Sequence, residues 1–153
     1  MEVALTYHTE DLRVLHAAYR AGREQAGLPP DAGTVSASRA MYVGDNDATA
    51  WREASEAAWL LNARMRRERA AIAALPAPQS VQEAAEQMQF VIGGPERCRT
   101  SVEELLHVLP FDVFNLQPRW AGLPAEQVEA SLRRFAEDVA PAFLAGDRAG
   151  GEA

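Results

Sequence analysis

One arginine and one acidic turn are the parts of this chain with the clearest potential for ligand chemistry. Arg39 lies in a segment of alternating polar and apolar residues, on the side occupied by Ala37 and Met41. An arginine that points into a fold needs an anionic or hydrogen-bonding partner, because burying an unpaired charge is costly. The sequence is equally compatible with a ligand contact and with a strand-end guanidinium that reaches solvent.

The turn Gly44-Asp45-Asn46-Asp47 has the Asp-x-Asp spacing with which a calcium-binding loop begins. Such a loop also requires a later glycine and a distant bidentate glutamate, and both are missing here. Aspartate and asparagine are good helix caps, since their side-chain oxygens accept the free N–H groups of a first turn. We therefore predict a helix cap at this turn and no calcium site.

No other side chains form a self-sufficient catalytic or metal-binding set. His8 and His16 are eight residues apart and lack a nearby third ligand, which argues against a metal site. Cys98, the single cysteine, falls on the apolar face of an expected helix and is interpreted as a small buried hydrophobic residue rather than a nucleophile. No carboxylate pair, nucleophile with its base, or phosphate loop can be assigned.

The composition is that of a globular domain, with 48% hydrophobic and 24% charged residues. The formal charge of −7 argues against nucleic acid or an anionic membrane as partner, since both require clustered positive charge. The lone cysteine, the acidic N-terminal stretch and the lack of an apolar run of roughly 18 residues predict a cytoplasmic protein. At 153 residues, the chain is too short for a complete eightfold barrel of about 250 residues.

Helical and strand periods predict the elements that position these residues. A helix capped by Thr9 is expected to end at Gly27, and a strand with period two follows over 34–43. Beyond the acidic turn, a long helix is predicted because apolar residues recur every three to four positions. They are Trp51, Ala54, Ala58, Leu61 and Met65. After a proline-rich break, Ser80-Val-Gln-Glu83 forms a capping box for a short helix.

The stretch from Phe90 to Leu123 organises the rest of the chain. An apolar triplet runs into Gly93-Gly94, and Pro95 is suited to the first position of a helix. A short apolar run over 113–116, closed by prolines, is typical of a buried strand in a parallel sheet. The last helix opens at Pro124, and residues 146–153 are expected to form a solvated tail.

Several of these segments together resemble the C-terminal part of luciferase-like flavin-dependent monooxygenases, the bacterial luciferase superfamily. The order and spacing of the segments carry the resemblance more than any one motif does. The segments are Met41-Tyr42-Val43-Gly44-Asp45-Asn46-Asp47-Ala48-Thr49-Ala50, Gly93-Gly94-Pro95-Glu96, Asn115-Leu116-Gln117-Pro118-Arg119-Trp120-Ala121-Gly122-Leu123-Pro124 and Phe135-Ala136-Glu137-Asp138-Val139-Ala140-Pro141.

The resemblance implies a partial (β/α) barrel, a helix-rich α/β fold with two to three parallel strands. Residues 1–145 would form the C-terminal half of the barrel, with 34–43 as its seventh strand and 112–117 as its eighth, and 146–153 would be a flexible tail. The half that carries the first six strands, which in the family supplies most flavin-phosphate contacts, is absent from these residues.

The resemblance also implies a site, because such barrels bind their ligands at the C-terminal ends of the strands. Arg39 would be a polar partner, Gln117 a hydrogen-bond donor, Arg119 an anion contact and Trp120 an apolar lid. Gly93 and Gly94 would open a helix whose free N–H groups attract a phosphate. The same Gly-Gly-Pro-Glu sequence also works as a simple turn and cap, and Glu96 repels phosphate.

Reduced flavin, as FMN, is the cofactor that the resemblance implies, with a deazaflavin as an alternative and no metal. The chain would then be a part or subunit of an oxygenase acting on a small organic substrate. A second polypeptide or a homo-oligomer would complete the barrel, since exposed strand edges invite pairing. The alternative from a different class is a shortened, flavin-free relative that acts as a structural or regulatory oligomeric partner.

Overall fold

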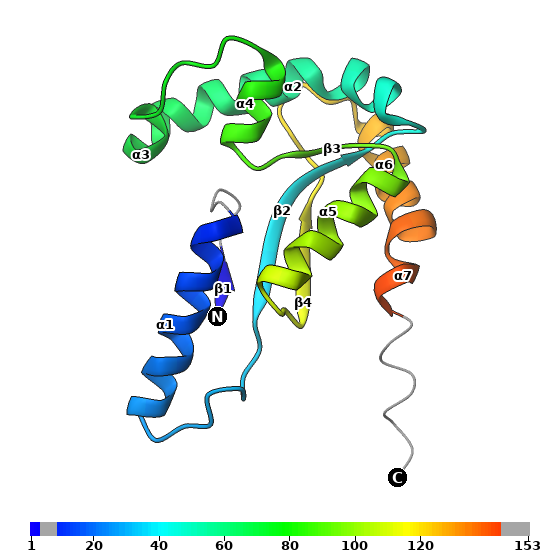
Figure 1. Ribbon diagram of the computed structural model, residues 1–153. Coiled ribbons are helices and arrows are strands. Elements are labelled where there is room, and N and C mark those ends of the chain that lie inside the picture. Colours follow the sequence, from blue (N-terminus) through cyan, green and yellow to red (C-terminus); the bar gives the residue numbers. More distant parts are fainter. Residues whose placement is uncertain (4–8, 145–153) are drawn as a thin grey trace.

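Strands and helices alternate along the chain in the computed structural model, which describes residues 1–3 and 9–144 (Figure 1). The strands are β1 (Glu2–Val3), β2 (Ser36–Val43), β3 (Val91–Gly93) and β4 (Val113–Gln117). The helices are α1 (Thr9–Gln25), α2 (Asp47–Glu68), α3 (Ala70–Ala73), α4 (Val81–Gln87), α5 (Pro95–Val108), α6 (Ala125–Arg134), the π-helical turn η1 (Phe135–Val139) and α7 (Pro141–Leu144).

The long strand β2 is the centre of a parallel sheet. The N–H groups of Ser36 and Gly44 donate to Met1 O and Gly93 O, so β1 and β3 lie along one edge of β2, at its start and at its end. The carbonyl of Val35 instead accepts from the start of β4, which pairs with the opposite edge over Ser36–Ala40. The backbone N–H and C=O groups of even-numbered residues point to one edge of a strand, and those of odd-numbered residues point to the other edge. This alternation places β1 and β3 on one side of β2 and β4 on the opposite side.

Helices cover both faces of β2, and seven of its eight residues are buried for that reason. On one face Ala40 and Tyr42 pack in a cluster with alanines of α2 and with Trp120. On the other face Ala37 packs with α1 and α5, and Met41 packs with α5 and η1. Figure 1 shows α2, α3 and α4 beyond the carboxyl end of β2, whereas α1 and α5 flank the strands.

Local signals predicted most of these elements correctly. The helix expected at Pro95 begins there, and the expected strands over 34–43 and 112–117 are β2 and β4, each shorter by one or two residues. The expectation that the 113–116 strand is buried is wrong, because no residue of β4 is fully buried and its outer edge is open. Strand β3 overlaps the apolar triplet before Gly93, where the sequence pattern did not predict a strand. The last helix is divided by η1, which the periodicity did not predict. His8 and the expected tail lie outside the described residues.

The outer edge of β4 is the open side of the sheet. No strand of residues 1–3 and 9–144 pairs with it, and Val113 is 42% exposed. An unpaired edge presents a row of backbone donors and acceptors to any strand that approaches. Among the described helices, none is long and apolar enough to span a bilayer.

Candidate functional site

The predicted site residues lie in three separate places, two of them at the carboxyl ends of strands and the third, Arg39, within β2. Gly93 and Gly94 adjoin an open groove of about 790 Å³ between the acidic turn and α5. Gln117, Arg119 and Trp120 line a smaller pocket beneath α2. Arg39 lines neither. We call the first region the acidic groove; it is lined by Asp45, Asn46, Asp47, Ala48, Gly94, Pro95, Glu96, Arg97, Thr100, Ser101 and Glu104.

Polar groups of the two turns beside the acidic groove, at 44–47 and 93–95, already form hydrogen bonds within the chain. Asn46 caps α2, with its Oδ1 accepting from Thr49 N–H at 2.9 Å, which confirms the predicted cap. The N–H of Gly94, at the start of α5, donates to Asp47 Oδ1 at 2.7 Å. A Cβ on Gly93 would lie 2.9 Å from that same oxygen, so the glycine allows the turns to approach. The phosphate role of Gly93 and Gly94 therefore stays a prediction, with one amide already bonded to a carboxylate.

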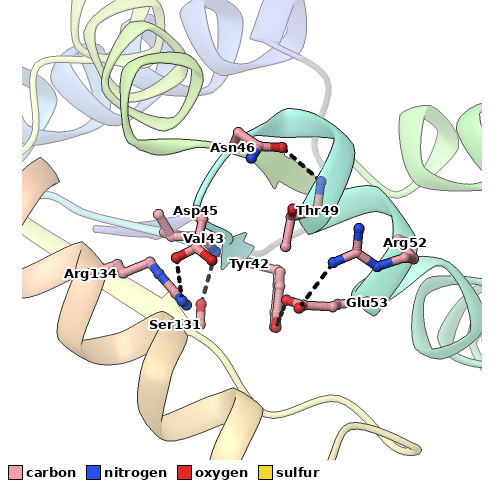
Figure 2. Close-up of polar contacts among 9 residues, drawn as sticks. All are labelled: Tyr42, Val43, Asp45, Asn46, Thr49, Arg52, Glu53, Ser131 and Arg134. Atoms are coloured by element: carbon pink, nitrogen blue, oxygen red, sulfur yellow. Dashed lines mark hydrogen bonds and ion pairs between the residues drawn. The ribbon is translucent and has the colours of Figure 1, made fainter.

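A polar network next to the groove fixes the end of β2 between two helices (Figure 2). The Tyr42 hydroxyl donates to Glu53 Oε2 at 2.8 Å, and Ser131 Oγ accepts from Val43 N–H at 2.8 Å. Burial, and then the hydrogen bond to Glu53, raise the pKa of Tyr42 well above its usual range. The phenol therefore stays protonated, and we assign this network to holding α2 and α6 against the sheet.

Arg39 is buried and lies apart from the other predicted residues. Its Nη1 donates to Ser38 O at 3.1 Å, and burial lowers the pKa of its guanidinium. In register it pairs with Leu116, which packs on the α5 side of the sheet, whereas Ala40 faces α2. The alternative of a strand-end arginine reaching solvent is wrong, and the structure does not bring Arg39 together with Gln117, Arg119 and Trp120.

The second region, here called the aromatic pocket, has a volume of about 190 Å³ beyond the carboxyl end of β4. Side chains of the second half of α2, the segment around α4 and the loop after β4 surround it. Its lining residues are Ala40, Leu61, Arg64, Met65, Arg69, Met88, Phe90, Gln117, Arg119 and Trp120.

Trp120 is the fixed wall of the aromatic pocket. Its indole Nε1–H donates to Gln117 O at 3.0 Å, and its ring stacks on Phe90 with centroids 5.0 Å apart. Tyr42 lies against it at 6.4 Å with the rings tilted by 56°. A buried indole whose N–H is satisfied offers a rigid apolar surface. The family resemblance implied that Trp120 would line a ligand site, and the structure shows that Phe90 stacks on its ring.

The aromatic pocket is cationic although the chain as a whole is acidic. Its lining includes three arginines and no acidic residue. Arg64 is engaged, since its Nε lies 2.8 Å from Glu68 Oε1. The guanidinium groups of Arg69 and Arg119 form no ion pair within residues 1–3 and 9–144. Sequence reasoning missed Arg69, because only the fold of α2 over the sheet brings it to the same pocket as Arg119.

The described residues offer little for metal or nucleophilic chemistry. No group of three or more His, Cys, Asp or Glu side chains among them could hold a metal ion. Cys98 is buried, as predicted, and burial raises the pKa of its thiol to about 12. The aromatic pocket could bind part of a flavin through ring stacking and arginine contacts, but it is smaller than the roughly 300–1,000 Å³ of a typical ligand pocket.

Comparisons with known proteins agree with this architecture. The family model for luciferase-like monooxygenases matches residues 2–112. No curated protein sequence matches the chain.

Three solved structures have similar folds. Monooxygenase RslO1 from Streptomyces bottropensis is 17% identical, with a TM-score of 0.73 over 93% of this chain and 41% of its own. The FMN complex of the oxygenating constituent of 3,6-diketocamphane monooxygenase from Pseudomonas putida is 19% identical, with a TM-score of 0.65 over 92% of this chain and 41% of its own. Coenzyme F420 dependent tetrahydromethanopterin reductase from Methanopyrus kandleri is 16% identical, with a TM-score of 0.61 over 93% of this chain and 44% of its own. The chain thus spans about two fifths of these structures.

Proposed function

The chain belongs to the luciferase-like monooxygenase family, and from this premise we propose that residues 1–145 act as the C-terminal part of a flavin-dependent oxidoreductase. The enzyme would oxygenate a small organic substrate with reduced flavin and O2. The observation that carries the proposal is the aromatic pocket, because it gathers Gln117, Arg119 and Trp120 at the strand end where barrels of this type place their ligands.

The residues of the aromatic pocket would bind and orient, while the cofactor would supply the redox chemistry when bound. Trp120, held by its bond to Gln117 O, would provide a flat wall that excludes water. The Gln117 side chain would donate a hydrogen bond, and Arg119 would contact an anionic group. Reduced FMN is the proposed cofactor, and F420 is the alternative, because one similar structure is an F420-dependent reductase.

Completion of the barrel is the second element of the proposal. The pocket would hold only part of a flavin, and similar structures have more than twice this length. Further strands added to the open edge of β4 would enlarge the site. They would come from a longer form of this chain, from a second polypeptide or from a second copy.

A flavin-free structural or regulatory role is the competing proposal. It is favoured by the acidic groove, where Gly94 N–H is bonded to Asp47 and several carboxylates would repel a phosphate. In this case the open edge of β4 would serve association alone.

Anaerobic titration of the purified chain with reduced FMN, oxidised FMN and F420, with the mass in solution followed in parallel, tests the proposal. We expect saturable binding of one cofactor that Arg119→Gln weakens and Arg67→Gln, an exposed change outside the pocket, leaves unchanged. A folded chain that binds none of the three at millimolar concentration would refute the flavin proposal for this chain and favour the structural role.

A further inference from the structure

We propose that the aromatic pocket binds a small organic anion, with the apolar body of the ligand against Trp120 and the oxyanion held by Arg69 and Arg119. The inference rests on the proposed function and deepens it by naming the ligand chemistry of the same pocket, an apolar body that carries an oxyanion. The binding itself belongs to the residues of this chain and does not require the cofactor.

The size of the aromatic pocket sets the size of the ligand. An apolar cavity of about 150 Å³ is sufficient to hold benzene. The pocket here has about 190 Å³, which leaves room for one ring or a short branched chain with a compact charged group. The stacked rings of Trp120 and Phe90 form one wall, while Met65 and Met88 contribute adaptable thioethers. A planar apolar body is the shape that such a wall favours.

The charge of the aromatic pocket sets the sign of the ligand. Arg69 and Arg119 come from the end of α2 and from the loop after β4, so they reach the pocket from two independent elements. Neither has an ion-pair partner in the described part of the chain, whereas Arg64 beside them is paired with Glu68. Guanidinium groups present a planar fork of donors that matches a carboxylate. In a chain of net charge −7, a pocket with no acidic residue and with two exposed arginines that have no ion-pair partner among the described residues favours an anion.

The test compares benzoate with its neutral analogue benzamide, added to the full chain without flavin. The indole N–H resonance of Trp120 in a nitrogen-15 NMR spectrum reports on binding, because that group lines the pocket and is bonded to Gln117 O. Trp120→Phe assigns the resonance among the three tryptophans. Arg69→Gln and Arg119→Gln test the two anion contacts, and Arg67→Gln is the matched exposed control outside the pocket.

We expect benzoate to shift the Trp120 resonance saturably and to bind at least about tenfold more tightly than benzamide, because only benzoate carries the negative charge that a guanidinium fork matches. Arg69→Gln and Arg119→Gln should each weaken benzoate about fivefold or more, and Arg67→Gln by less than twofold. Equal affinity for the two compounds, or no shift with benzoate, would overturn the inference. Flavin binding without benzoate binding refutes this inference alone, and benzoate binding without flavin binding refutes the proposed function alone.

Discussion

The acidic groove and the aromatic pocket both lie at carboxyl ends of the parallel strands, and they use their polar groups in opposite ways. In the groove, Gly94 N–H donates to Asp47, and Asp45 pairs with Arg134. In the pocket, Arg69 and Arg119 have no ion-pair partner within the described residues, and the aromatic wall is rigid. Donors bonded within the chain hold the fold together, whereas free donors beside an apolar wall are available to a ligand. Substitutions in the groove should therefore change stability, and substitutions in the pocket should change binding.

The largest expected effect is at Gly44, between β2 and α2. A Cβ at this position would lie 2.7 Å from the backbone nitrogen of Ala50 and 2.8 Å from its Cα. Gly44→Ala should therefore lower the free energy of unfolding by about 3 kcal/mol, because backbone atoms cannot move aside cheaply. Urea denaturation measures the change. The control is Gly22→Ala in the exposed part of α1, where a Cβ would meet no atom within 4 Å. This substitution should raise the free energy of unfolding by up to about 1 kcal/mol, because alanine favours a helix more than glycine does.

Asp47 provides the next largest effect. Asp47→Ala removes the acceptor of Gly94 N–H and should lower the free energy of unfolding by about 1–3 kcal/mol, because a part-buried donor loses its partner. Asp31→Ala, which breaks only an exposed pair with Arg20, should change it by less than about 1 kcal/mol. Equal losses in the two variants would contradict the structural role of the groove.

Cys98 is buried in the core with Met41 and Val43, and its thiol leads us to expect a loss of stability at alkaline pH. Burial, and then the charge of Asp47, raise the pKa of its thiol to about 12 from an ordinary value of 9.0. A raised pKa stabilises the fold below the unfolded value, and this contribution is lost as the pH rises from about 9 towards 12. Chemical denaturation at pH 8 and pH 10.5 should show a smaller decline for Cys98→Ala than for the unmodified chain. An equal decline in both would show that the thiol does not contribute.

The smallest effect on stability is expected in the aromatic pocket. Arg119→Gln changes an exposed side chain with no ion-pair partner among the described residues, so the free energy of unfolding should change by less than about 0.5 kcal/mol. The same substitution should weaken ligand binding. A loss of stability above 1 kcal/mol would place Arg119 with the structural residues and remove the contrast between the two regions.

The sequence predicted those features that depend on neighbours along the chain. Pro95 marks the start of α5, Asn46 caps α2, and Ser80 Oγ accepts from Glu83 N–H as the capping box requires. Each is a local preference of backbone geometry and short-range hydrogen bonding. The buried position of Cys98 followed from its place on an apolar helix face.

The sequence did not predict features that depend on contacts between distant segments. The aromatic pocket exists because α2 lies over the sheet and brings Arg69 to the same cavity as Arg119, fifty residues later in the numbering. The stacking of Phe90 on Trp120 and the bond from Tyr42 to Glu53 have the same origin. The hydrogen bond from Gly94 N–H to Asp47 Oδ1 joins two turns that are 47 residues apart, and no local sequence pattern indicates this bond.

The most direct test of the contrast is a nitrogen-15 NMR titration of the chain with FMN, in which both regions report in one spectrum. We predict saturable shifts at the Trp120 indole and at the amides of Gln117 and Arg119, with the amides of Gly93 and Gly94 unmoved. Shifts confined to Gly93 and Gly94 would contradict the account, because they would place the ligand in the acidic groove and leave the aromatic pocket without a function.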